Sequence, residues 1–501
     1  MRIPHIINKN TLVAYNPSAV TLSLLHEQNR QLLSEDLMRK DLPPTLVSLC
    51  VMAIAKNFEA CPIINELVLC ADRDFLLEIL PTDLPLSLVV PIIEDEIYWM
   101  RRYTNKYGVM AQHCHVGWTW KCIFLENHIQ ELIETAQPEY NDEENLEEIT
   151  NLTNLYVHRL VISQLQAWKS PLTMDADEIP EILPCDHINL EPIFRRLQNV
   201  QELVIKFGMN NVGESFQWNM FRVSIDDAKH LAAAIVNLKT LRVLDLHASN
   251  IEDKHLQILA QELIKVDTLE ELSMKNCLIE DQGALCIAKV MLTHPTLQKL
   301  ILANNKIGGR GGEGIGYALT KDTCCPMRHL DLRLNPLGHI GVMGLFRALV
   351  RVQKVEELII SGVGFGDETG IRLGAVIQLN SALKLLDVSN NWCKPGEKEI
   401  CNAILTNSTL QWLDIRETDI SEPYYGSIMR RLKKNRKNDP NAEEEEEEAG
   451  EEEELMYEAE YFNEAYEGEG EEGTYFLHVE EEQEEESDLE VEDAVDTSIA
   501  S

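Results

Sequence analysis

Aspartate recurs at one position of a short sequence line that returns seven times between residues 241 and 420. The four aspartates are Asp245, Asp331, Asp387 and Asp414. General acid and base catalysis needs a pair of carboxylates within a few ångström of one substrate atom in a closed pocket. An open array of repeats offers no such pocket, so we expect no catalytic residue and no enzymatic activity.

Charged and aromatic side chains accompany these aspartates and could bind a protein. The position two residues further along holds His247, Lys275, Arg333 and Arg416 in different copies of the line. Trp412, Asp414 and Arg416 form the cluster most typical of a binding hot spot, because tryptophan and arginine are enriched there. We predict an interaction face made of Asp245, His247, Lys275, Asp331, Arg333, Asp387, Trp412, Asp414 and Arg416. The alternative is an ordinary solvated sheet face.

A second group of potential ligands consists of His113, Cys114, His115, Cys122 and His128. Structural zinc sites pair ligands as C-x2-4-C with H-x3-5-H, which this group does not supply, so we expect no metal. The same part of the chain gathers three of the seven tryptophans within 22 residues. They are Trp99, Trp118 and Trp120. They predict a second protein-interaction surface, with an aromatic core as the alternative.

The glycine-rich stretch GGRGGEGIG at residues 308–316 has the composition of a phosphate-binding loop. It lacks the Lys-Ser/Thr ending of a P-loop, and it falls at the turn into a predicted helix. We therefore expect no nucleotide and no other cofactor.

The line that carries the aspartates has the pattern L-x-x-L-x-L. Its copies begin at Leu241, Leu269, Leu297, Met327, Val355, Leu383 and Leu410. The intervals are 28, 28, 30, 28, 28 and 27 residues, a regularity that is the signature of leucine-rich repeats. The two inner leucines of each line predict a short strand, and the second half of each repeat has helical apolar periodicity.

Alternating strands and helices predict an α/β solenoid, a horseshoe with a parallel inner sheet and outer helices. The period and the full helix resemble the ribonuclease-inhibitor-like class of these repeats. Small polar residues follow most strands, and we expect them to hydrogen-bond buried turn backbone. They are Ser249, Cys277, Asn305, Asn335, Asn391 and Thr418. Val363 occupies this position in one repeat and cannot do so.

The chain divides into five predicted parts. They are an N-terminal arm (1–42), a mainly helical domain (43–136), an acidic and Pro-rich connector (137–192), the repeat domain with a basic terminal helix (193–438) and an acidic tail (439–501). The connector contains a possible first strand within residues 156–165, where apolar residues partly alternate. The first repeat, near residue 200, carries the insertion GMNNVGESFQWNMFRV.

The formal net charge of -40 belongs mainly to the tail, since residues 441–501 hold 28 Asp and Glu and no Lys or Arg. With no large basic face, nucleic acid is not expected as a partner. The 12 cysteines are scattered, and several lie in apolar runs, which is typical of reduced thiols in the cytoplasm. We expect no signal peptide, no membrane span and no membrane partner.

Several segments outside the repeats carry a family resemblance. NFEACPIINEL, LPTDLPLSLVVPIIEDEIYWMRR, GWTWKCIFLENHI, ESFQWNMF and IDDAKHLAAAI resemble the leucine-rich-repeat subunit 5 family of the axonemal dynein regulatory complex, over about residues 45–434. The resemblance implies a non-enzymatic component of the nexin link between doublet microtubules in cilia or flagella. Its implied partners are other subunits of the complex, including coiled-coil ones, and, directly or indirectly, the microtubule and the dynein arms.

Two other classes of protein remain as alternatives. A GTPase-activating protein for a nuclear-transport GTPase also combines long leucine-rich repeats with an acidic C-terminal tail, although it would leave residues 43–136 unexplained. A cytosolic inhibitor that holds a partner on its concave face is the other alternative.

Overall fold

The computed structural model describes residues 45–64, 66–67, 69–108, 119–140, 142–168, 185–213 and 216–437. The predicted arm (1–42) and acidic tail (439–501) lie outside the described residues, and so do His113, Cys114, His115 and Trp118.

Nine short parallel strands form one sheet in sequence order. They are β1 (Arg159–Ile162), β2 (Glu202–Ile205), β3 (Val243–Asp245), β4 (Glu271–Ser273), β5 (Lys299–Ile301), β6 (His329–Asp331), β7 (Glu357–Ile359), β8 (Leu385–Asp387) and β9 (Trp412–Asp414). One leucine of each strand is paired with a leucine of the next from Leu160 to Leu413, and all are buried. This register places the leucines on the core face and the residues on either side on the opposite face.

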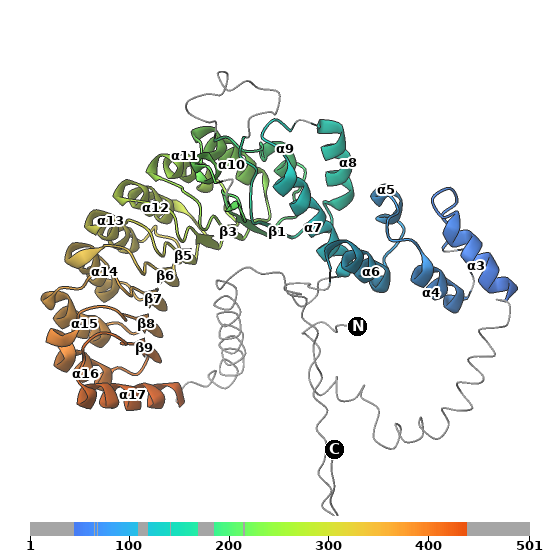
Figure 1. Cartoon of the computed structure of the whole chain (residues 1–501). Helices are drawn as coiled ribbons and strands as arrows, with labels where there is room; N and C mark the ends of the chain where they lie inside the picture. The colour runs from blue at the N-terminus through green and yellow to red at the C-terminus, as the bar shows by residue number, and fades with distance from the viewer. Residues whose placement is uncertain are drawn as a thin grey trace, which may run out of the picture. The chain divides into compact units, whose positions relative to one another are not determined.

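One helix follows each strand and packs beside the helix of the next repeat. These are α9 (Glu191–Phe194), α10 (Ile225–Asn237), α11 (Asp253–Leu263), α12 (Asp281–Thr293), α13 (Gly309–Leu319), α14 (Gly338–Arg351), α15 (Asp367–Leu379), α16 (Glu397–Thr406) and α17 (Glu422–Lys437). Two 3-10 helices, η3 (Trp218–Phe221) and η4 (Lys394–Gly396), interrupt the pattern. The strands line the inner side of the repeat array and the helices its outer side (Figure 1). The predicted leucine-rich-repeat fold is confirmed.

The polar residues that follow the strands hydrogen-bond the turn backbone, as predicted. The Nδ2 of Asn305 donates to the carbonyls of Met274 and Leu302, at 2.8 and 3.0 Å, and its Oδ1 accepts the N–H of Ile279 at 3.1 Å. Asn335 and Asn391 make the same bonds one and three repeats later. Each turn is thereby fixed to the repeat before it.

The turn that contains Val363 is stabilised in a different way, because valine has no polar side chain. Gly362 just before it has a φ of 61°, the left-handed conformation that Asn304 and Asn390 adopt in neighbouring repeats. Asn391 of the next repeat accepts hydrogen bonds from the N–H groups of Val363 and Gly364, both at 3.1 Å. Glycine supplies the conformation without strain, and the next repeat's amide serves the backbone donors.

In the described part of the chain six helices precede the sheet, and the first five share an aromatic core of their own. The six helices are α3 (Leu46–Lys56), α4 (Cys70–Ile79), α5 (Leu86–Val89), α6 (Glu96–Tyr107), α7 (Trp120–Thr135) and α8 (Glu143–Thr153). Phe58, Leu76, Tyr98, Trp99 and Phe124 are buried in this core.

Helix α7 belongs to both cores. Phe124 in its first half is part of the N-terminal core, whereas Ile129 and Ile133 in its second half are part of the repeat core. The repeat core therefore begins within α7 and β1, before the predicted domain start at residue 193. The strand β1 lies inside the stretch 156–165 and pairs with β2.

Two glutamates of α7 accept hydrogen bonds from backbone along the first strand. The Oε1 of Glu126 accepts the N–H groups of His158 and Arg159, at 2.9 and 2.8 Å. Two turns further along the helix, the Oε1 of Glu134 accepts the N–H of Ser163 at 2.7 Å. The first strand of a sheet has no neighbour on one side, so these carboxylates satisfy donors that would otherwise lack a partner.

Burial raises the pKa of Glu126 from 4.5 to about 7, and the hydrogen bonds from Arg159 and His158 only partly oppose this rise. Because the pKa is higher in the folded chain, the folded state binds the proton more tightly than the unfolded state does. The stability that protonation of Glu126 contributes is complete below pH 4.5 and is lost as the pH rises through about 7.

We predict that replacing Glu126 with Gln, which keeps a carbonyl acceptor, removes this pH dependence. Between pH 5 and 8 the wild-type chain should lose up to about 3 kcal/mol more unfolding free energy than the variant loses. Urea unfolding at both values of pH, followed by hydrogen exchange at the amides of His158 and Arg159, measures the difference. Equal losses in the two chains would contradict the assignment.

Candidate protein-interaction surface

The predicted face lies on the side of the sheet opposite the core. In β3, for example, Leu244 and the following Leu246 are buried in the core, whereas Asp245 and His247 are partly exposed. The alternation of side chains along a strand directs the equivalent residues to the same face in each repeat, where Ser273 and Asp331 are themselves buried.

The first cluster on this face joins two repeats. The Oδ2 of Asp245 lies 3.3 Å from the Nδ1 of His247 and 3.9 Å from the Nζ of Lys275 in the next repeat. Burial alone would raise the pKa of Asp245, but its polar neighbours His247 and Ser273 and the charge of Lys275 outweigh this effect and hold the pKa below its usual value. Lys275 remains about half exposed, so its ammonium group can contact a partner.

Three of the four aspartates perform one local task. Asp331, Asp387 and Asp414 each accept the backbone N–H of the residue two positions later, at 2.9–3.0 Å. These bonds fix the chain as it leaves the strand, in the manner of Asx turns. Recurrence of aspartate at this position is therefore explained by the turn.

Asp331 requires a correction, because only 1% of its side chain is exposed. It cannot contribute a contact surface of its own. Its Oδ2 lies 2.9 Å from the Nε of Arg333, and burial, the dominant effect, raises the pKa of Asp331 despite this charge. The guanidinium of Arg333 is half exposed, so Asp331 orients a residue that can make contacts.

The predicted hot-spot residues lie together at the last strand. Arg416 holds both carboxylate oxygens of Asp414 through its Nε and Nη2, at 3.0 and 2.6 Å from Oδ2 and 3.1 Å from Oδ1. Burial alone would raise the pKa of Asp414, but the hydrogen bonds and charge of Arg416 lower it overall. Trp412 is 47% exposed, and the guanidinium carbon of Arg436 lies 4.1 Å from the centre of its ring.

Arg436 was not predicted as part of this cluster. It lies on α17, and the basic residues there are also explained by the favourable interaction of cations with a helix C-terminus. No spacing rule reveals that α17 packs back onto β9, so the stacking of Arg436 on Trp412 could not be read from the sequence.

The N-terminal tryptophans differ in their surroundings. Trp99 is fully buried, donates its Nε1–H to the carbonyl of Ile93 at 2.9 Å and makes an edge contact with Tyr98. The prediction that Trp99 belongs to an interaction face is therefore wrong, because it has no exposed surface. Trp120 is half-buried and packs against Tyr103, with ring centres 5.7 Å apart.

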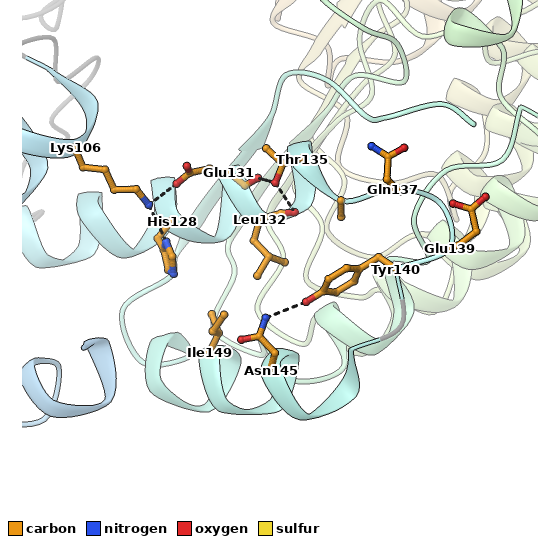
Figure 2. Close-up of a pocket in the computed structure, with 11 residues that line it drawn as sticks. Lys106, His128, Glu131, Leu132, Thr135, Gln137, Glu139, Tyr140, Asn145 and Ile149 are labelled. Carbon is orange, nitrogen blue, oxygen red and sulfur yellow. Dashed lines mark hydrogen bonds and ion pairs between the residues drawn. The ribbon is translucent and has the colours of Figure 1, made fainter. Parts of the chain in front are cut away.

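A groove of about 710 Å³ lies between α7 and α8, and no sequence pattern predicted it (Figure 2). Leu132 and Ile149 form an apolar side, and the Oη of Tyr140 accepts a hydrogen bond from Asn145 at 3.1 Å. At one end Lys106 bonds His128 at 3.2 Å and pairs with Glu131.

His128 in this groove is neutral near pH 7. Burial lowers its pKa to about 4, and the charge of Lys106 adds to the effect. The neutral ring can accept at Nδ1 the hydrogen bond that the ammonium group of Lys106 donates. Among the described residues, no three His, Cys, Asp or Glu side chains are grouped to hold a metal ion.

The glycine-rich stretch forms the contact between α13 and α14. A Cβ at Gly316 would lie 2.6 Å from backbone atoms of Gly344, and one at Gly312 would lie 2.9 Å from the Cα of Gly341. Side chains on these faces would push the two helices apart. Close packing therefore accounts for the glycines.

The fold and this surface define a leucine-rich-repeat protein. A family model described as Leucine Rich repeat matches residues 293–316 and 323–346. Beyond the repeat class, the chain is 30% identical to mouse Dynein regulatory complex subunit 5 over 246 residues, which are 46% of this chain and 48% of that protein. The proteins of the same name from human and Chlamydomonas reinhardtii are 29% and 28% identical, over 43% and 42% of this chain and 44% and 50% of theirs.

These comparisons confirm the resemblance to dynein regulatory complex subunit 5. The chain spans about half the length of the curated relatives it matches. Among solved structures, Leiomodin-1 Actin-Binding Site 2 aligns with 46% of this chain and 99% of its own, at 16% identity and a TM-score of 0.23, which supports no conclusion. No helix in the described part of the chain has the length and apolar character to cross a membrane.

We predict that Gly316→Ala destabilises the repeat domain by about 1–3 kcal/mol, because the new methyl group meets backbone that cannot rotate away. The matched control is Gly426→Ala in α17, where a Cβ meets nothing within 4 Å. That change should stabilise the chain by about 0.5–1 kcal/mol through helix propensity. Urea unfolding of both variants measures the effects, and equal stability would show that the glycines are not needed for packing.

Proposed function

We propose that this chain is a non-enzymatic structural and protein-interaction subunit of the nexin–dynein regulatory complex. In this role it resides on axonemal doublet microtubules and supports the regulation of dynein-driven motility of cilia or flagella. The observation that carries the proposal is the similarity to proteins named Dynein regulatory complex subunit 5, since a complex subunit acts through binding its neighbours. Its partners are other subunits of the complex, including coiled-coil ones, and the microtubule and dynein arms directly or indirectly.

The exposed side chains of the sheet support a binding role. Lys275, Arg333 and Arg416 extend from successive parts of the face, and each is about half exposed or more. Aspartates hold Arg333 and Arg416 in one orientation, so less side-chain entropy is lost when they bind a partner. With Trp412 beside them, they provide the arginine and aromatic anchors found at hot spots.

We expect the Trp412→Ala, Arg416→Ala double variant to lose incorporation into axonemes. Removal of a hot-spot residue costs about 2 kcal/mol or more, which weakens binding roughly thirtyfold. The variant is expressed in ciliated cells that lack the gene, and its amount in detergent-extracted axonemes is compared with that of the wild-type chain. Trp392→Ala is the control, because Trp392 is also about half exposed but lies outside the predicted face. Full incorporation of the double variant would rule out this face as the essential contact.

We also predict that cells without the gene assemble cilia of normal length but beat with an altered waveform. High-speed imaging of the beat measures this, and restoration by the wild-type chain is the control. Normal motility in the deletion strain would contradict the proposed role.

The two alternatives predict different results. A GTPase-activating protein would accelerate GTP hydrolysis by a nuclear-transport GTPase, which the purified chain should not do. A cytosolic inhibitor would be absent from detergent-extracted axonemes and present in the soluble fraction.

A further inference from the structure

Helix α17 carries a high local positive charge. It contains six basic residues, Arg430, Arg431, Lys433, Lys434, Arg436 and Lys437. Its one acidic residue, Glu422, lies in the first turn at the other end. The favourable effect of cations at a helix C-terminus extends over the last turn, so it does not account for the whole set.

Two of the six basic residues attach the helix to the last repeat. The Nε and Nη2 of Arg431 donate to the carbonyl of Asn407, at 3.1 and 2.9 Å, and Arg436 stacks on Trp412. Arg431 and Arg436 therefore hold α17 against the last repeat.

The other four basic residues form a stripe on the exposed side of α17. They are Arg430, Lys433, Lys434 and Lys437, and all four are exposed. Their spacing of i, i+3, i+4 and i+7 places them on one face of the helix. Ile428, Leu432 and Asn435 on the other side are buried against the repeat core. We call these four residues the basic stripe.

No carboxylate in the described part of the chain forms an ion pair with the basic stripe. The guanidinium of Arg430 bonds the carbonyl of Gly426 and the hydroxyl of Ser427, which are neutral. Four neighbouring cations that have no carboxylate partner among residues 45–437 as described repel one another, so binding of an anionic ligand relieves this repulsion.

We propose that the basic stripe binds an acidic peptide segment of a partner protein. The stripe covers about two helical turns, roughly 10 Å along the axis, which suits a short run of carboxylates. A long polyanion such as a nucleic acid or an anionic membrane would extend beyond the stripe, so only a small part of its charge would be neutralised there. Charge complementarity on this scale therefore favours a peptide, and the proposal does not depend on membership of the regulatory complex.

A fluorescein-labelled peptide of alternating Glu and Ala tests the proposal by fluorescence anisotropy with the full chain at an ionic strength of about 0.1 M, where the Debye length is about 10 Å. The test variant replaces Arg430, Lys433, Lys434 and Lys437 with Gln and should weaken binding about tenfold or more. The matched control replaces Lys239, Lys254, Lys289 and Lys398 with Gln, four exposed lysines on other elements, and changes the net charge equally. It should change the affinity less than about twofold, since distant charges are screened.

Four outcomes would overturn the proposal. They are absence of binding to the wild-type chain, equal weakening by both variants, tighter binding of a DNA duplex or of phosphatidylserine vesicles than of the peptide, and peptide binding that appears only after residues 438–501 are removed. Circular dichroism and thermal unfolding verify that the stripe variant is folded. Because the binding test uses purified protein, its result is independent of axonemal incorporation.

Discussion

The structure depends on burial of one leucine ladder, and a ladder of this kind has two open ends. Each strand contributes its leucine to a core that continues into the next repeat. A repeat cannot bury its apolar face alone, so the first and last repeats need another element to cover them. At the first end this element is α7, whose Ile129 and Ile133 extend the core and whose Glu126 and Glu134 bond backbone near β1.

At the last end α17 performs the corresponding task with different chemistry. Ile428 and Leu432 are part of the repeat core, and the Nδ2 of Asn435 donates to the carbonyls of Asn407 and Leu410, at 3.2 and 2.8 Å. Asn407 itself makes equivalent bonds to Ile377 and Asn380 one repeat earlier. The amide of Asn435 thus takes the place that the next repeat would fill.

The parts of this architecture that repeat were predictable, and the parts that occur once were not. Leu244 and its equivalents recur at a fixed period, so their burial and the parallel sheet follow from spacing alone. The turn bonds of Asn305 follow from residue type and position in the same way. By contrast, the burial of Trp99 and the stacking of Arg436 on Trp412 depend on how helices fold back over long distances, which no local pattern encodes. The aspartates lie between these cases, because their position was predictable but their use in turns was not.

The turn hydrogen bonds of the aspartates limit which side chains of the sheet face can contact a partner. Aspartate oxygens that accept turn N–H groups are already engaged, and the most exposed groups of the predicted face are the ends of Lys275, Arg333 and Arg416 and the ring of Trp412. These are cations and an aromatic on a chain that is acidic overall. A partner with carboxylates would be attracted to these cations and oriented by the repulsion from the acidic remainder of the chain, an effect on orientation more than on affinity.

Helix α17 both covers the end of the repeat core and carries the densest positive charge of the described chain. It brings Arg436 to Trp412 and presents its other cations on its exposed side. A change in α17 therefore affects stability and recognition together, and separating them requires substitutions on its exposed side only.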